Sequence, residues 1–185
     1  MGIRLRGAAL ESAILDEAAR LFAERGYSAT AIQSVADGVG YSKAAILARY
    51  ASKERLFSAV VDYCTSVAAD ILTAVDASGS DDRDLESITT FTDTALEHPG
   101  FAALILVAAT SAQNELKSAL TSVGDLIPQI FKTHPSSLES LERRVHITAA
   151  LSVVASLVLV AADELPASAA RPLIINAAMG ALKGV

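Results

Sequence analysis

The side chains with the clearest chemistry are the cations of one N-terminal stretch. Lys43, Arg49 and Lys53 carry positive charge within the segment KAAILARYASK. Such cations bind phosphate, so we expect Lys43 to reach a base edge or a phosphate, and Arg49 and Lys53 to hold the backbone of a nucleic acid. The alternative for the two lysines is a solvated surface charge. The stretch therefore predicts a nucleic-acid contact surface.

Two short helices around a glycine turn must position these cations. Ala36, Gly40 and Ile46 stand where a helix-turn-helix needs a small residue, a turn glycine and a buried apolar residue. This unit places its second helix in the DNA major groove. We expect helices at about Ala9–Glu24, Ala31–Gly38 and Lys43–Tyr50, and a long one after Ser52 that reaches Val75.

Hydroxyl residues precede the last three of these helices. Thr30 and Gln33 have the spacing of a capping box, and Ser42 and Ser52 stand at N-cap positions. Thr30 and Gln33 can also face a phosphate at a helix N-terminus, the alternative being capping alone. Tyr50 is expected either in the core or against DNA. The predicted DNA-binding residues are Thr30, Gln33, Ser42, Lys43, Ala44, Ala45, Leu47, Arg49, Tyr50 and Lys53.

The composition indicates an all-α protein with a large core. Of 185 residues, 52% are apolar and 19% are charged, and alternation typical of strands is scarce. We expect about nine helices in two domains: a head (residues 1–52) that binds DNA, and a larger body (residues 53–185) with a sensor or dimerisation role. In the body we predict helices at about Leu85–Glu97, Pro99–Ala112, Glu115–Phe131, Ser136–Asp163 and Pro166–Lys183.

Charge is distributed unevenly along the chain. Residues 1–55 carry eight basic and six acidic side chains, whereas the remainder carries seven and fifteen, so that a net charge of +2 is followed by one of −8. This asymmetry is compatible with DNA binding through the head alone. A single cysteine, Cys64, and an N-terminus without a signal-peptide pattern favour a reducing, cytoplasmic location.

One apolar stretch admits two interpretations. VHITAALSVVASLVLVAA, residues 145–162, is near the lower length limit for a membrane span. His146, Thr148, Ser152 and Ser156 interrupt it, and small residues suit close contact between helices. We therefore expect a buried helix and no membrane.

The segment from Ala18 to Phe57, AARLFAERGYSATAIQSVADGVGYSKAAILARYASKERLF, resembles the TetR family of bacterial one-component transcription regulators. The resemblance implies a homodimer joined through the last two long helices, at about 136–163 and 166–183. It also implies a small-molecule pocket enclosed by the middle helices, and a double-stranded DNA operator as partner. We expect a ligand-responsive repressor of a palindromic operator, without a cofactor.

The second helix of the motif departs from the family pattern. Leu47 stands where a phosphate-contacting tyrosine is common, Ala45 replaces a hydroxyl, and Arg49 occupies a position that is often aromatic or His. A hydroxyl donor to phosphate is missing and an arginine is gained. Ala44 or Ala45 remains suited to contact a thymine methyl group.

The body shows no catalytic or metal-binding pattern. His98, His134 and His146 lack the spacing of a helical metal pair, so we predict neither an enzyme nor a metal site. The alternatives considered are an enzyme or carrier on a helical bundle, and a scaffold of the same fold without specific DNA binding. The candidate pocket residues, each of which suits the core as well, are Tyr63, Val67, Phe91, Phe101, Ile105, Phe131 and His146.

Overall fold

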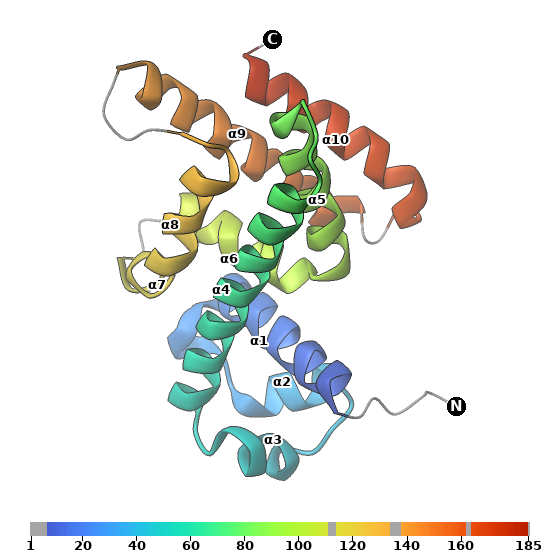
Figure 1. Cartoon of the computed structure of the whole chain (residues 1–185). Coiled ribbons are helices and arrows are strands. Elements are labelled where there is room, and N and C mark those ends of the chain that lie inside the picture. The colour runs from blue at the N-terminus through green and yellow to red at the C-terminus, as the bar shows by residue number, and fades with distance from the viewer. Residues whose placement is uncertain (1–6, 111–113, 134–137, 162–163, 185) are drawn as a thin grey trace.

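The computed structural model describes residues 7–110, 114–133, 138–161 and 164–184, and every regular element within these ranges is a helix (Figure 1). The all-α prediction is thus confirmed. The helices are α1 (Ala8–Ala29), α2 (Ile32–Gly38), α3 (Lys43–Tyr50), α4 (Lys53–Ala77), α5 (Arg83–Glu97), α6 (Pro99–Thr110), α7 (Asn114–Ala119), α8 (Thr121–Ile130), α9 (Leu138–Ala161) and α10 (Ala167–Lys183).

Helices α1, α2 and α3 build the head, which lies at the bottom of Figure 1. The expected stop of the first helix is only partly right. Gly26 breaks α1 with a positive φ of 77°, but helical backbone resumes and continues to Ala29. Only a glycine adopts this conformation without strain. The buried side chains of Phe22, Val35, Ala36 and Ile46 fill the head and belong to a hydrophobic core that continues into the body.

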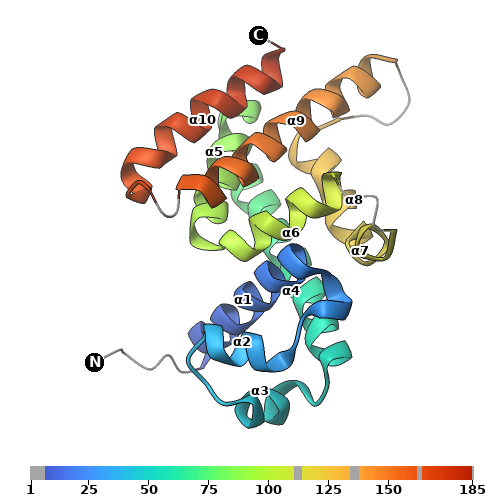
Figure 2. The ribbon, with the colours of Figure 1, turned by 180° about the vertical axis from the view of Figure 1, so that it is seen from behind.

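Two helices connect the head to the body. Helix α4 has 25 residues, which corresponds to about 38 Å, and rises without a break from the head into the body (Figure 1). Its buried stripe runs from Leu56 through Cys64 to Val75. Helix α6 lies between α1 and the rest of the body (Figure 2). The head is therefore held at two places.

The expected single helix from Glu115 to Phe131 is wrong. Leu120, with φ −94° and ψ 18°, separates α7 from α8. The Thr121 hydroxyl donates to the carbonyl oxygen of Ser118, which competes with a continuous helix at this point. Leu120 at this break, and Val123 and Ile130 of α8, are all buried.

Helices α9 and α10 lie side by side at the end of the body that is remote from the head (Figures 1 and 2). They match the predicted helices, although residues 136–137 and 162–163 fall outside the described ranges, and Pro166 caps α10 instead of starting it. Large apolar side chains remain exposed on this pair: Leu141, Val145 and Val160 on α9, and Leu173 on α10.

Two helices, Lys53–Ala77 and Ser140–Ala161, are long and apolar enough to cross a membrane on length and composition alone. Both contribute to the core, through Val60 and Ile71 of α4 and through Val154 and Val158 of α9. The apolar character of residues 145–162 is accounted for in part by this core role and in part by the exposed face of α9.

Candidate nucleic-acid interface

The turn between α2 and α3 sets the angle at which α3 leaves the head. Gly40 has a positive φ of 70°, and the Tyr41 amide donates to the Ala36 carbonyl oxygen at 2.8 Å. Val35 is fully buried, and Ile46 is anchored in the same core. The small residue, the turn glycine and the buried apolar residue all stand as predicted, and α2 and α3 form a helix-turn-helix.

Helix α3 presents one face to solvent. The Ser42 hydroxyl accepts a hydrogen bond from the Ala45 amide at 3.2 Å, so the predicted N-cap is confirmed. Ile46 and Tyr50 face the core, and Leu47 is half-buried. The exposed residues of this segment are Ser42, Lys43, Ala44, Ala45, Ala48 and Arg49.

Arg49 is paired within the head. Its guanidinium lies 3.5 Å from the Glu11 carboxylate of α1, and both side chains are well exposed. An exposed pair of this kind contributes little to stability and is screened by salt. The pair does place a negative charge beside a cation of the exposed α3 face.

Lys53 is directed into the head rather than away from it. Its ammonium donates to the carbonyl oxygens of Tyr27, Ser28 and Thr30 at 2.9, 3.1 and 3.2 Å. It also lies 4.5 Å from the centroid of the Tyr27 ring. An ammonium has three donors, so these three bonds satisfy it fully. The expected contact of Lys53 with a nucleic-acid backbone does not fit this arrangement.

Thr30 does not cap α2, which corrects the predicted capping box. The N-cap is Ala31, and no side chain caps it. The buried Thr30 hydroxyl is placed to donate to the carbonyl oxygens of Leu21, at 3.0 Å, and Gly26, at 2.8 Å. These carbonyls lie around the break at Gly26. Thr30 therefore stabilises the end of α1 and does not face solvent.

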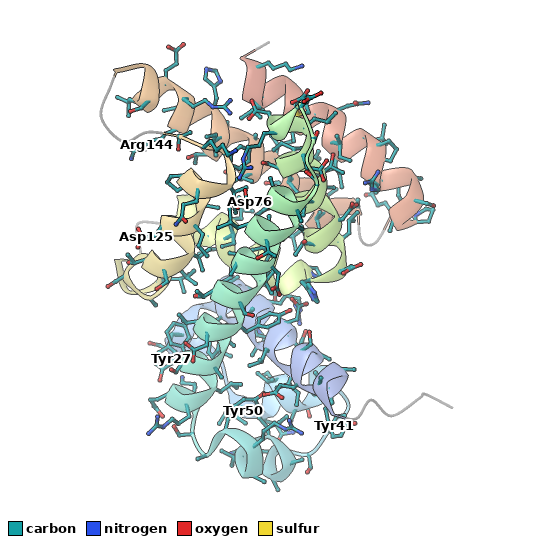
Figure 3. The ribbon with its side chains drawn as sticks, in the orientation of Figure 1. Tyr27, Tyr41, Tyr50, Asp76, Asp125 and Arg144 are labelled. Atoms are coloured by element: carbon teal, nitrogen blue, oxygen red, sulfur yellow. The ribbon has the colours of Figure 1, made fainter. Side chains whose placement is uncertain are left out.

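Gln33 and Tyr50 have different surroundings. Gln33 is exposed on α2, and its amide donates to Asp37 at 2.7 Å. Tyr50 lies inside the head (Figure 3), and its hydroxyl has no hydrogen-bond partner among the described residues. Burial raises the pKa of Tyr50, and the Glu11 charge adds to that effect. Of its two predicted roles, Tyr50 occupies the core one.

The structure adds two residues that the sequence had not singled out. The Arg25 guanidinium donates to the Ser34 hydroxyl of α2 at 3.2 Å, which brings another exposed cation beside the motif. Tyr41 is half-buried directly before the Ser42 cap (Figure 3). Their proximity in sequence to the motif was the available signal. The position of Arg25 beside α2 follows the break in α1 at Gly26, which the sequence alone did not locate in space.

The body contains a cavity of about 580 Å³ among α6, α8 and α9. Its lining is mostly aliphatic, and polar groups come from α8 and α9. Arg144, Thr148 and Ser152 recur every four residues along α9, a spacing that places them on one helix face. Figure 3 labels Arg144 and Asp125, which flank the cavity from α9 and α8. Further lining residues are Ile105, Leu106, Ala108, Leu120, Val123, Ile127, Ile147 and Leu151.

Of the seven predicted pocket residues, Ile105 alone lines this cavity in the described part of the chain. Phe91 and Phe101 are buried against each other, with ring centroids 5.8 Å apart. Val67 and Phe131 are also buried in the core. Phe91, Phe101, Val67 and Phe131 are therefore core residues, which was the alternative to a place in the pocket.

The other two predicted pocket residues make specific contacts elsewhere. The Tyr63 ring packs edge-on against His98, with centroids 5.9 Å apart. His146 faces α10, where its Nδ1 atom lies 3.1 Å from the Ala181 carbonyl oxygen. His134, the third histidine, falls outside the described residues. The sequence feature that could have indicated the cavity is the row of polar residues on α9, Arg144, Thr148 and Ser152.

Comparison with known proteins agrees with this geometry. Residues 14–60 match the family described as bacterial regulatory proteins, tetR family. No curated protein matches the chain by sequence.

Solved structures with the same fold cover nearly the whole chain. A TetR-like transcriptional regulator from Rhodococcus sp. RHA1 is 22% identical over 98% of this chain and 100% of its own, with a TM-score of 0.62. The fatty acid degradation regulator FadR from Bacillus halodurans is 15% identical over 97% and 98%, with a TM-score of 0.60. Residues 14–60 of this chain are therefore similar to the tetR family of bacterial regulatory proteins, and the whole chain has the fold of TetR-like transcriptional regulators.

Proposed function

We propose that this protein is a ligand-responsive repressor that binds a palindromic DNA operator as a homodimer in the cytoplasm. The observation that carries the proposal is the exposed face of α3, with Lys43 at its start and Arg49 near its end. These cations would contact phosphates, and the N-terminal amides of α3 would add to the attraction. Ala44 and Ala45 would approach thymine methyl groups.

Dimerisation would occur through α9 and α10. Val145 and Leu173 are each 60% exposed, although large apolar side chains in a monomeric protein are mostly covered. A two-fold axis would bring the same faces of two copies together as a four-helix interface. The two α3 helices would then enter successive major grooves about 34 Å apart.

The effector would bind in the cavity among α6, α8 and α9. Its volume lies in the range of small-molecule sites, and an aliphatic lining with a few polar groups is typical of them. An effector that prefers one arrangement of the heads would shift the population by no more than its differential affinity. Release from DNA on effector binding is the behaviour we propose. Residues 1–52 would then bind DNA, and residues 53–185 would bind the effector and form the dimer.

A scaffold without specific DNA binding is the second candidate. It is favoured by the alanines on the exposed face of α3, which offer no hydrogen-bond donor to a base edge. We rank it below the repressor because a scaffold has no need of exposed cations on this face. The proposal includes no enzymatic activity.

The test is selection of bound duplexes from a random DNA pool by purified protein at physiological salt. Moderate salt suppresses weak electrostatic binding to any sequence. We expect a palindrome with half-sites one helical turn apart. Failure of a folded, dimeric protein to enrich any sequence would favour the scaffold.

Variants then locate the reading surface. Lys43→Ala should weaken binding to the selected duplex across sequences and reduce the salt slope by about one. The exposed Lys132, which follows α8 in the body, provides the matched control, because Lys132→Ala removes the same charge far from α3. If the two variants bind the duplex with equal affinity, Lys43 and the α3 face do not form the DNA-binding surface.

A further inference from the structure

An acidic side chain of the head holds the first turn of a helix of the body. The Asp16 carboxylate of α1 accepts hydrogen bonds from the backbone amides of Gly100 and Phe101, both at 3.1 Å. These amides belong to the first turn of α6, where a helix leaves its N–H groups without intrahelical partners. A carboxylate at a helix N-terminus also interacts favourably with the helix dipole. Asp16 thus caps a helix 84 residues further along the chain.

The two backbones approach so closely at this point that residue 100 has no room for a side chain. A Cβ atom on Gly100 would lie 1.8 Å from the Asp16 carbonyl oxygen. Since that neighbour is backbone, a side chain at residue 100 would force α1 and α6 apart. The Asp16 carboxylate and the glycine together define one relative position of the two helices.

The carboxylate is half-buried, whereas Gly100 and Phe101 are both buried. Burial raises the pKa of Asp16, whereas the hydrogen bonds from Gly100 and Phe101, and then the neighbouring His98, lower it. Loss of the carboxylate would leave two amides without acceptors, and a buried unsatisfied group is costly. The contact is therefore expected to be either fully made or broken as a unit.

The other end of the same helix reaches the cavity. Ile105, Leu106 and Ala108 of α6 line the cavity, and α6 has 12 residues, or about 18 Å. The first half of this short helix, from Gly100 to Leu104, is buried in the packed core, which leaves it little room for bending. A shift of α6 at the cavity is therefore felt at Gly100.

We infer that the Asp16 cap on α6 couples the cavity to the DNA-reading head. This inference rests on the proposed function and names the residue through which regulation passes. When the cavity is empty, the cap holds α1 in the orientation that binds DNA. Displacement of α6 by an occupant breaks the cap and frees the head. Asp16 is a positioning residue, since it touches neither DNA nor the cavity.

Binding linkage is reciprocal, so DNA serves as the probe and no effector is required. The experiment adds the duplex selected from the random pool to the full-length dimer and follows methyl NMR signals. Ile46 reports on the head, and Ile105 reports on the cavity. In the wild-type protein we expect DNA to shift both signals. We also expect exchange of the Gly100 and Phe101 amides to slow about fivefold or more, a typical strength of coupling.

Asp16→Ser removes the double acceptor. DNA should still shift the Ile46 signal, while the shift at Ile105 disappears. Asp93→Asn is the control, because Asp93 is another carboxylate in a contact between helices, with Arg171 of α10, but lies away from α1. Its Ile105 response should match that of the wild type. Should Asp16→Ser fail to fold, Asp16→Asn keeps the size and one acceptor oxygen and should retain less than half of the Ile105 shift.

The outcomes separate the two proposals. If the protein selects no duplex, the proposed function is wrong, and so is the proposed coupling that depends on it. A wild-type protein that binds DNA but shows no change at Ile105 overturns the coupling alone. An undiminished Ile105 response in a folded Asp16 variant overturns the role of Asp16.

Discussion

The ammonium group of Lys53, at the start of α4, lies 2.9 Å from the Tyr27 carbonyl oxygen and 4.5 Å from the centroid of the Tyr27 ring. One side chain thereby joins the end of α1 to the beginning of the helix that leaves the head. Tyr27 also packs edge-on against Phe57 and donates its hydroxyl hydrogen to Glu54. The angle between α1 and α4 is set by this group of contacts.

Substitution of Lys53 should therefore lower the stability of the fold, because its ammonium group bonds to the head and not to DNA. Lys53→Met keeps the apolar stem but leaves the carbonyl oxygens of Tyr27, Ser28 and Thr30 without their donor. We expect the free energy of unfolding to fall by about 1–3 kcal/mol in urea denaturation. Lys43→Met, at an exposed site, should change it by less than about 0.5 kcal/mol. Similar values for the two variants would contradict the structural role of Lys53.

Neutralising Glu11 should strengthen DNA binding. Glu11 competes with phosphate for Arg49, and the pair is exposed, so its removal is expected to be worth about 0.2–1 kcal/mol. Glu11→Gln should thus tighten binding about 1.4- to fivefold at low salt, measured by fluorescence anisotropy on the selected duplex. The gain should shrink as salt screens the charges.

Glu24→Gln is the matched control for this prediction. Glu24 also lies on α1 and pairs with a cation, Arg20, rather than with Arg49. It should leave the affinity for DNA nearly unchanged. An equal gain from both variants would indicate a general effect of charge and would exclude a specific release of Arg49.

The exposed apolar face of α10 provides a test of the dimer. Leu173→Glu would place two carboxylates near each other across the proposed two-fold axis, without disturbing the core of the monomer. We expect a monomer in analytical ultracentrifugation at concentrations where the wild type is a dimer. Leu85→Glu, at an exposed leucine of α5, should leave the assembly unchanged. A dimer that survives Leu173→Glu would require another interface.

Cys64 predicts the response of stability to alkaline pH. Burial raises the pKa of its thiol to about 12, whereas the pKa of an exposed cysteine is about 8.5. Between these values the unfolded state loses its proton and the folded state does not, so this group's contribution to stability falls as the pH rises.

The check compares urea unfolding at pH 8 and pH 10. Cys64→Ala should lose about 1–2 kcal/mol less stability than the wild type over this interval. The comparison uses the change with pH, so the small cavity left by the substitution cancels. Equal losses would show that the Cys64 thiol titrates normally in the folded protein.

The helix-turn-helix could be predicted from the sequence because its determinants are local. Ser42 and Ser52 cap the helices that follow them, and the turn depends on one glycine, Gly40. Thr30 shows where local reasoning fails. Its hydroxyl can either accept from the amides of α2 or donate to the carbonyl oxygens of α1. The position of α1 in the folded protein favours the second arrangement.

The cavity could not be predicted in the same way. Aromatic residues such as Phe91 and Phe101 suit a pocket and a core equally, and here they fill the core. The polar row on α9 marks one wall of the cavity, but its position also depends on the break at Leu120 and on the packing of α6 against α9, neither of which leaves a periodic signal in the sequence. The same holds for Asp16, whose partners are remote in the chain.

The division of α3 into two faces has a consequence for how this head can change. Its anchoring residues, Ile46 and Tyr50, point inward, while Ala44, Ala45 and Ala48 project outward as single methyl groups. A larger side chain at any of these three positions extends into solvent and meets no core atom. In the proposed complex with an operator, single substitutions at these positions would therefore change the DNA preference and leave the stability of the head intact.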